Sequence, residues 1–289
     1  KMLTYLTEEF GNPSSKYYNL AVHAKEAIEE ARKNVALLLN AKENEIFFTS
    51  GATESNNMIL KGVADYYSTK GKHIITSKVE HKSVIDVCKF LETKNFEVTY
   101  LDVDQYGRIN PDELLNTIRE DTIIVSIIWG NNELGSLNDI KQISQICYDR
   151  QVFFHTDATQ VLGKFPIDLQ SLKGISFLSC SAHKLHGPKG VGATFIRSDE
   201  FGNPIPITPL LHGGDQENGI RSGTQAVHNM VGFGEAARIA YENLEKNIHQ
   251  LQNLEKKLTL LLKQNFGDKI VFNSDDNNKI PGIINVRFV

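Results

Sequence analysis

Thr122-Ile-Ile-Val-Ser-Ile-Ile-Trp129 is the longest apolar stretch of this 289-residue sequence, and it predicts a buried strand. Apolar residues at helical spacing over 140–149 predict a helix next, and Val152-Phe-Phe-His155 predicts a second strand. Two strands joined by a helix form the βαβ unit of a parallel sheet. This segment therefore favours an α/β fold.

The same alternation of strands and helices runs through most of the chain. Asn110-Pro-Asp-Glu113 combines a capping residue, a proline and acids in the first turn, which is typical of a helix start. The expected fold is a mostly parallel mixed sheet flanked by helices. Further strands are predicted at 45–49, 73–76, 98–101, 175–180 and 191–196, and further helices at 20–39, 51–66 and 83–94.

The pattern changes after Thr224. Residues 226–266 predict an almost continuous helix, because leucine and isoleucine recur at steps of three and four. We expect this helix to pack on its own domain, although a coiled coil would show the same spacing. Short β-rich runs at 269–272 and 284–288 predict the first strands of a smaller domain. The expected division is a large domain over 1–240, then a linking helix and an incomplete small C-terminal domain over 241–289.

The composition is that of an ordinary globular protein, with a net charge of −4. This charge argues against nucleic acid or an anionic membrane as a partner, because both attract clusters of Lys and Arg. The longest apolar stretch is much shorter than the ~20 residues that span a bilayer. Three cysteines without paired spacing argue against a disulfide framework, and no secretory leader precedes Phe10. We therefore expect a cytoplasmic protein.

A lysine within Ser181-Ala-His-Lys-Leu-His-Gly-Pro-Lys-Gly-Val-Gly192 directly follows a predicted buried strand. The amine of this residue, Lys184, is expected to be partly shielded from water, which favours the neutral form that makes a Schiff base. The glycines permit a tight return into the next strand. A surface lysine in a glycine-rich turn is the alternative interpretation.

An acidic residue, Asp157, ends the apolar strand within Phe153-Phe-His-Thr-Asp-Ala-Thr-Gln160. Burying a carboxylate is unfavourable unless a cation meets it. A pyridinium nitrogen is such a cation, and Gln160 is close enough in sequence to contact the same ligand. A carboxylate that caps the next helix is the alternative for Asp157.

Small residues in Thr49-Ser-Gly-Ala-Thr-Glu-Ser55 join a predicted strand to a helix. Backbone N–H groups at such a helix start, together with the Thr53 hydroxyl, can bind a phosphate. A plain helix cap is the commoner explanation, and neither of the common glycine-rich nucleotide-binding patterns is present.

Other polar residues follow predicted strands at the carboxyl edge of the sheet, where open α/β sheets bind ligands. His81 can stack on a planar ligand or transfer a proton there, and a structural or solvent-facing histidine is the alternative. Asn131-Asn-Glu-Leu-Gly135 and Arg221-Ser-Gly-Thr224 are further polar clusters. The histidines and cysteines lack the spacing of a zinc site.

Together these segments resemble the class V branch of the fold-type I pyridoxal-phosphate enzymes, and in particular the cysteine desulfurases of the nitrogen-fixation/iron–sulfur type. The motifs run in the family's order from Phe10-Gly-Asn-Pro-Ser-Ser15 to the segment 212–224. The resemblance implies a large PLP-dependent transferase-like domain and a homodimer. Tyr17, where many relatives have histidine, and Ala182, where glycine is common, depart from the pattern.

The resemblance also implies a role for each site residue. Lys184 would form the Schiff base with pyridoxal 5′-phosphate, and Asp157 would pair with the pyridinium nitrogen. Gln160 would bind the phenolic oxygen, and His81 would stack on the ring as a further catalytic residue. The remaining implied ligands are Ala52, Thr53, Ser181 and His183 for the phosphate, Thr224 for the phosphate of the partner subunit, and Asn132 for the substrate and cofactor pocket.

The activity implied by the resemblance is conversion of L-cysteine to L-alanine. A catalytic cysteine of the C-terminal domain takes the sulfur as a persulfide, and an acceptor protein carries it to iron–sulfur clusters or tRNA thiolation. Neither that cysteine nor the arginine that binds the substrate carboxylate is recognised here, so a fragment that is inactive by itself is expected. Cys88, Cys147 and Cys180 are expected to serve packing. A selenocysteine lyase, a kynureninase-like enzyme and a non-catalytic truncated dimerisation module are the alternatives.

Overall fold

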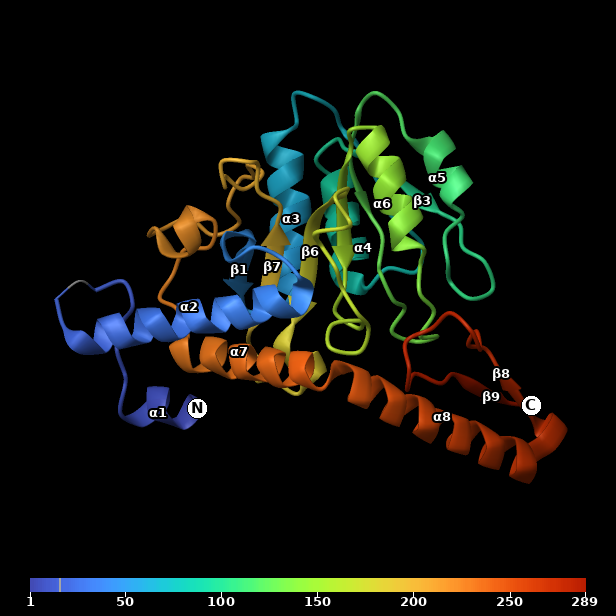
Figure 1. Ribbon diagram of the computed structural model, residues 1–289. Helices are drawn as coiled ribbons and strands as arrows, with labels where there is room; N and C mark the ends of the chain where they lie inside the picture. The colour runs from blue at the N-terminus through green and yellow to red at the C-terminus, as the bar shows by residue number, and fades with distance from the viewer. Residues whose placement is uncertain (16) are drawn as a thin grey trace.

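The computed structural model describes residues 1–15 and 17–289, and its described part is built around a seven-stranded sheet (Figure 1). The strands lie in the order β1-β7-β6-β5-β4-β2-β3. All neighbours from β6 to β3 pair in parallel, whereas β7 pairs antiparallel with both β6 and β1. The sheet is therefore mixed and mostly parallel, as predicted. The strands are β1 (Ile46–Thr49), β2 (His73–Ser77), β3 (Glu97–Leu101), β4 (Thr122–Ser126), β5 (Phe153–Asp157), β6 (Ile175–Ser181) and β7 (Gly192–Ile196).

Helices cover both faces of this sheet. Successive strand residues point to opposite faces, so each face presents apolar side chains that pack against helices. Phe48, in β1, packs in a core with α2, α5, α6 and α7, whereas its neighbour Phe47 packs in a second core with α3 and α4. A Cβ on Gly234 of α7 would collide with Ala31 of α2, so these two helices approach closely. The helices are α1 (Met2–Thr7), α2 (Asn19–Leu39), α3 (Ala52–Tyr66), α4 (Lys82–Glu92), α5 (Pro111–Thr117), α6 (Ile140–Asp149), α7 (Val227–Glu242) and α8 (Leu244–Phe266).

Three elements differ from the sequence-based expectation. The short helix α1 was not predicted, and β4 ends at Ser126 rather than at Trp129. The long helix expected over 226–266 is two helices, because Asn243 leaves the helical conformation with φ −115° and ψ 11°. α7 packs closely on α2, whereas α8 has no buried residue.

The C-terminal segment folds back toward the sheet after α8 (Figure 1). It forms a two-stranded antiparallel sheet of β8 (Ile270–Phe272) and β9 (Val286–Phe288). Lys279 forms an ion pair of 2.6 Å with Glu255 of α8, and Leu137 N donates to the carbonyl of Asn278 at 3.2 Å. The division of the chain at residue 240 stays a prediction.

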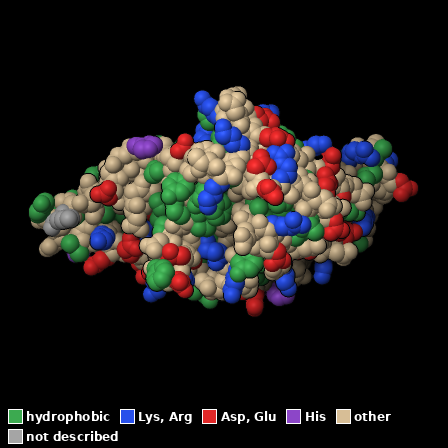
Figure 2. Space-filling model, turned by 90° about the horizontal axis from the view of Figure 1, so that it is seen from above, with side chains coloured by type: hydrophobic (Ala, Val, Ile, Leu, Met, Phe, Trp, Pro, Cys, Tyr) green, Lys and Arg blue, Asp and Glu red, His purple; other side chains and the backbone are tan. Residues whose placement is uncertain are grey.

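The surface of the molecule mixes both signs of charge. Figure 2 shows basic and acidic side chains interspersed over one face, with hydrophobic side chains gathered near its middle. Among the described residues, no helix combines the length and the apolar character that a membrane crossing requires.

Candidate active site

A cavity of about 490 Å³ lies at the carboxyl edge of the parallel strands. Its walls come from the loops and helix starts that follow β1, β2, β4, β5 and β6. The structure therefore brings together side chains that are far apart in sequence. The predicted site residues that line this cavity are Ala52, Thr53, His81, Asn132, Asp157, Gln160, Ser181, His183 and Lys184. Thr224, the remaining predicted residue, is exposed and is not among the lining residues.

The start of α3, which lines the cavity, is suited to an anion. α3 begins there after Gly51, which provides no side-chain cap, so the first N–H groups of the helix have no partner within it. A Cβ on Gly192 would lie 2.6 Å from the Cα of Gly51, so β7 and this helix start approach closely. His183 Nδ1 lies 2.8 Å from Ser181 Oγ. Burial and the charges of Lys184 and Lys189 lower the pKa of His183.

A buried carboxylate also lines the cavity. Asp157 is 4% exposed; its Oδ2 accepts from Asn56 Nδ2 at 2.8 Å, and its Oδ1 accepts from Thr159 N at 3.0 Å. It caps no helix, because turns follow it rather than the helix considered as an alternative. Thr159 Oγ1 also lines this region and is buried without a hydrogen-bond partner among the described residues.

No cationic side chain of the described residues forms an ion pair with this carboxylate. None of the ion pairs within 1–15 and 17–289 includes Asp157. His155 lies two residues earlier in β5, but burial lowers its pKa to about 4. Its ring is held between Ser126 Oγ at 2.8 Å and Ser179 Oγ at 2.9 Å. A neutral His155 leaves the charge of Asp157 available to a cationic ligand in the cavity.

A chain of hydrogen bonds links Asp157 to His81. Asn56 Nδ2 donates to Asp157 and also to Ser83 Oγ at 2.8 Å. Ser83 Oγ lies 2.8 Å from His81 Nδ1, which also accepts from Ser83 N at 3.1 Å. His81 is the N-cap of α4, so its ring is oriented by the helix that it caps. An acceptor at Nδ1 leaves the proton of the neutral ring on Nε2.

Lys184 lies between two cavities. It belongs to a short 3₁₀ helix, Ala182–Leu185, directly after β6, and its side chain is half-buried. It lines the cavity of Asp157 and also a second cavity of about 550 Å³ beside α7 and α8. It takes part in no ion pair of the residues that the structure describes.

None of the three cysteines is among the described residues that line this cavity. Cys88, Cys147 and Cys180 are all free and buried, and burial raises the pKa of each thiol to about 12. Thiolates are the reactive form of cysteine, so these three side chains are inert in the folded protein. The described residues contain no group of three or more His, Cys, Asp or Glu that could hold a metal ion.

Asn56, Ser83 and Thr159 were not predicted as site residues, although each contacts a predicted site residue or lines the cavity. The spacing of Asn56 from a predicted site residue could have identified it. It lies four residues after Ala52, on the same side of α3. The role of Ser83 depends on contacts between distant segments, which a local pattern does not contain.

The fold and the cavity define an α/β enzyme with an amine, a buried carboxylate and an anion site in one pocket. The chain belongs to the class V aminotransferase family, whose model matches residues 1–289. The cofactor of this family is pyridoxal 5′-phosphate.

The chain is similar to bacterial cysteine desulfurases. The chain is 47% identical over 289 residues to the cysteine desulfurase IscS of Neisseria meningitidis serogroup A, covering 100% of this chain and 70% of the relative. A solved NifS-like protein superposes with a TM-score of 0.91 at 40% identity, over 97% of this chain and 74% of that one. A structure described as SspA in complex with cysteine has a TM-score of 0.77 at 40% identity, over 82% and 67%.

The residues present fit the cofactor. The cavity offers an amine for its aldehyde, a carboxylate without a protein cation for its ring nitrogen, and unpaired helix N–H groups for its phosphate. The buried Thr159 hydroxyl, which has no partner among the described residues, supplies a further polar group. When bound, the cofactor supplies an electron sink for bonds at the substrate's α-carbon.

Proposed function

We propose that this chain is the cofactor-binding part of a cysteine desulfurase that takes sulfur from L-cysteine and leaves L-alanine. The observation that carries the proposal is that Lys184, Asp157 and the uncapped start of α3 all line one cavity. The cysteine desulfurases among the relatives and the cysteine complex of SspA support this substrate.

The proposed roles follow from position and chemistry. Lys184, whose side chain is half-buried, would hold the cofactor through its aldehyde. Asp157 keeps the ring nitrogen protonated, and Asn56 orients its carboxylate. His81 lies against the ring, held by Ser83, with its Nε2 proton available for transfer. Gln160 binds the phenolic oxygen, and Asn132 lines the substrate side.

The phosphate is proposed to lie at the start of α3. Ala52 and Thr53 offer backbone N–H groups and a hydroxyl, and Ser181 and His183 complete the site from the end of β6. The two basic residues that follow, Lys184 and Lys189, add positive charge. Thr224 is proposed to reach the phosphate of a partner subunit.

A homodimer is the assembly that this role of Thr224 requires. A groove of about 1140 Å³ runs beside α2 and the segment 215–218, and it is wide enough to take side chains of a second copy. Large apolar side chains near the start of α2 are exposed, among them Phe10 at 73% and Tyr17 at 93%. Such side chains are typical of a protein interface. Sedimentation equilibrium is expected to give twice the mass of the chain.

The sulfur step is proposed to use a cysteine other than the three buried ones. Its thiolate would attack the sulfur of the substrate and keep it as a persulfide, while the electron pair of the broken Cβ–S bond would stay on Cβ, which would take up a proton to give alanine. A sulfur-acceptor protein, for iron–sulfur cluster assembly or tRNA thiolation, would then take the sulfur. This chemistry suits a reducing cytoplasm.

The test is cofactor binding followed by turnover. The chain mixed with pyridoxal 5′-phosphate is expected to give a visible absorption band, and borohydride is expected to fix the cofactor to Lys184, as read by peptide mass spectrometry. Lys184→Ala is expected to remove this adduct. A chain that binds no cofactor would refute the proposal. Robust sulfide release by these 289 residues alone would refute the requirement for another cysteine, and release of alanine from selenocysteine but not from cysteine would change the substrate.

A further inference from the structure

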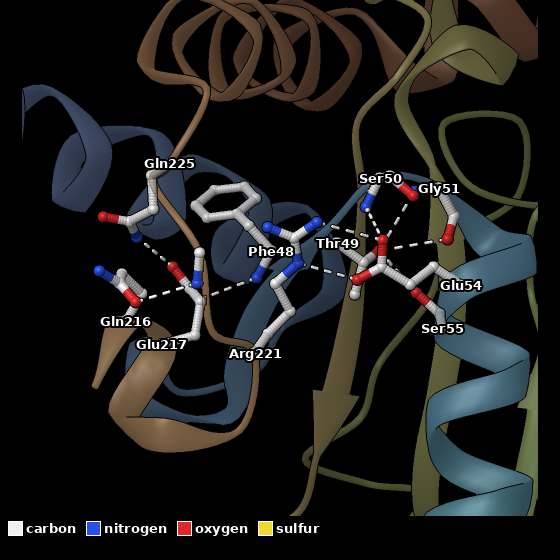
Figure 3. Close-up of polar contacts among 11 residues, drawn as sticks. Phe48, Thr49, Ser50, Gly51, Glu54, Ser55, Gln216, Glu217, Arg221 and Gln225 are labelled. Carbon is white, nitrogen blue, oxygen red and sulfur yellow. Dashed lines mark hydrogen bonds and ion pairs between the residues drawn. The ribbon is translucent and has the colours of Figure 1, made fainter. Parts of the chain in front are cut away.

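An ion pair lies directly beside the proposed phosphate site. Glu54, in the first turn of α3, lines the cavity, and its Oε1 accepts from Arg221 Nε at 2.9 Å (Figure 3). Its Oε2 accepts from Arg221 Nη2 at 3.3 Å and from Ser50 N at 3.0 Å. The side chains of Glu54 and Arg221 are only 13% and 20% exposed. The pair therefore lies largely outside the screening of bulk water.

The position of Glu54 raises a question of charge. A phosphate at the start of α3 carries about two negative charges, and a carboxylate in the same helical turn repels it. Burial raises the pKa of Glu54, but hydrogen bonds from Arg221 and Ser50 lower it by more, so Glu54 stays ionised. The guanidinium of Arg221 is the cation that compensates this charge.

Arg221 bonds the carboxylate of Glu54 from outside the cavity. It is not among the residues that line the cavity. The segment that carries it is also held by a second, separate carboxylate, because Glu217 accepts from Phe48 N at 2.9 Å and from Gln225 Nε2 at 2.5 Å (Figure 3). Glu217 also accepts from Arg32 Nη1 at 2.8 Å. Loss of the Arg221 side chain therefore leaves this segment attached to β1.

We propose that Arg221 is a positioning residue that neutralises Glu54 and thereby allows the start of α3 to accept the phosphate of the cofactor. The inference rests on the proposed function, because it takes the phosphate to bind at this helix start. It assigns to the ion pair a specific task, which is discrimination in favour of a phosphorylated ligand over the same ring without phosphate.

The experiment compares two ligands, pyridoxal 5′-phosphate and pyridoxal, by absorbance titration of the cofactor-free chain. Arg221→Met is expected to weaken binding of the phosphorylated ligand by about tenfold or more, and binding of pyridoxal by less than about threefold. Glu54→Gln/Arg221→Met is expected to recover most of the lost affinity, because it removes the uncompensated charge as well. Arg221→Lys keeps the charge and is expected to keep most of the preference for the phosphorylated ligand.

The matched control is Gln225→Ala, which loosens the same segment without changing any charge beside the phosphate. It is expected to change the affinities for both ligands by similar factors. An equal loss of affinity for both ligands in Arg221→Met, or a double variant as weak as Arg221→Met, would overturn the inference. If Arg221→Met is unfolded by circular dichroism, Arg221→Lys and the double variant are each compared with the wild type, and loss of the preference for the phosphorylated ligand in both would overturn the inference. A wild-type chain that binds neither ligand would instead overturn the proposed function.

Discussion

Glu80 is a carboxyl group that the fold keeps out of water beneath the proposed active site. It is 8% exposed, and its Oε1 accepts from Ser77 Oγ at 2.6 Å and from Ile128 N at 2.9 Å. Its Oε2 is buried without a partner among the described residues. Burial raises the pKa of Glu80 to about 8, the two hydrogen bonds oppose this, and the charge of Asp157 adds to it. Cys88 of α4 also faces it, with its thiol protonated.

The raised pKa of Glu80 makes the stability of the folded protein depend on pH. In the folded protein Glu80 keeps its proton up to about pH 8, whereas in the unfolded chain it loses the proton above its ordinary pKa of 4.5. The stability that the protonated group contributes is therefore complete below about pH 4.5 and is lost as the pH rises to about 8. At 1.36 kcal/mol for each pH unit, the interval corresponds to roughly 5 kcal/mol.

Glu80→Gln tests this reasoning, because an amide accepts the same two hydrogen bonds and carries no charge at any pH. The free energy of unfolding in urea, followed by circular dichroism, is compared for the variant and the wild type between pH 5 and pH 8. As the pH rises over this range, the free energy of unfolding of the variant is expected to increase by several kcal/mol relative to that of the wild type. Glu80→Ala is expected to be destabilised at every pH, because it leaves the Ile128 N–H without its acceptor. A constant difference between Glu80→Gln and wild type would refute the raised pKa.

Three further outcomes test other parts of the structure. Asn56→Ala breaks the chain of hydrogen bonds from Asp157 to His81 and is expected to lower the free energy of unfolding, measured in urea, by about 1–3 kcal/mol. The neighbouring change Asn57→Ala removes a hydrogen bond to the carbonyl of Thr53 near the surface and is expected to have little effect in the same titration. The three cysteines are expected to stay unreactive toward a thiol-specific disulfide reagent in buffer and to react fully in urea; fast reaction in buffer would contradict their burial. Gly234→Ala is expected to cost about 1–3 kcal/mol in thermal unfolding, because the new Cβ collides with α2.

Much of the fold could be predicted because its strands are short apolar runs and its helices have a clear apolar face. The predicted ends of α2 and α6 agree with the structure within a residue. The break at Asn243 could not be predicted, since the apolar spacing continues through it and only the backbone conformation changes. The helix α1 is too short for its periodicity to be distinguished from that of a loop.

The residues that line the candidate site could be predicted better than the hydrogen bonds that hold them in position. The carboxyl edge of the sheet gathers Lys184, Asp157 and His81, and a rule of topology identifies that edge from the sequence. The hydrogen bonds of Asn56 and Ser83 join α3, α4 and β5, and no local pattern specifies such contacts. Their function could be recognised only once these elements were packed together.

The antiparallel pairing of β1 with β7 has a consequence for the order of folding. Ile46 pairs with Phe195, so the edge of the sheet that carries the start of α3 closes only after most of the chain has been made. Contacts between residues so distant in sequence carry a large loop-closure entropy and slow the folding reaction. During synthesis, the region around Gly51 stays without its neighbour Gly192 until β7 has left the ribosome, so ligand capture at this helix start reports a completed sheet.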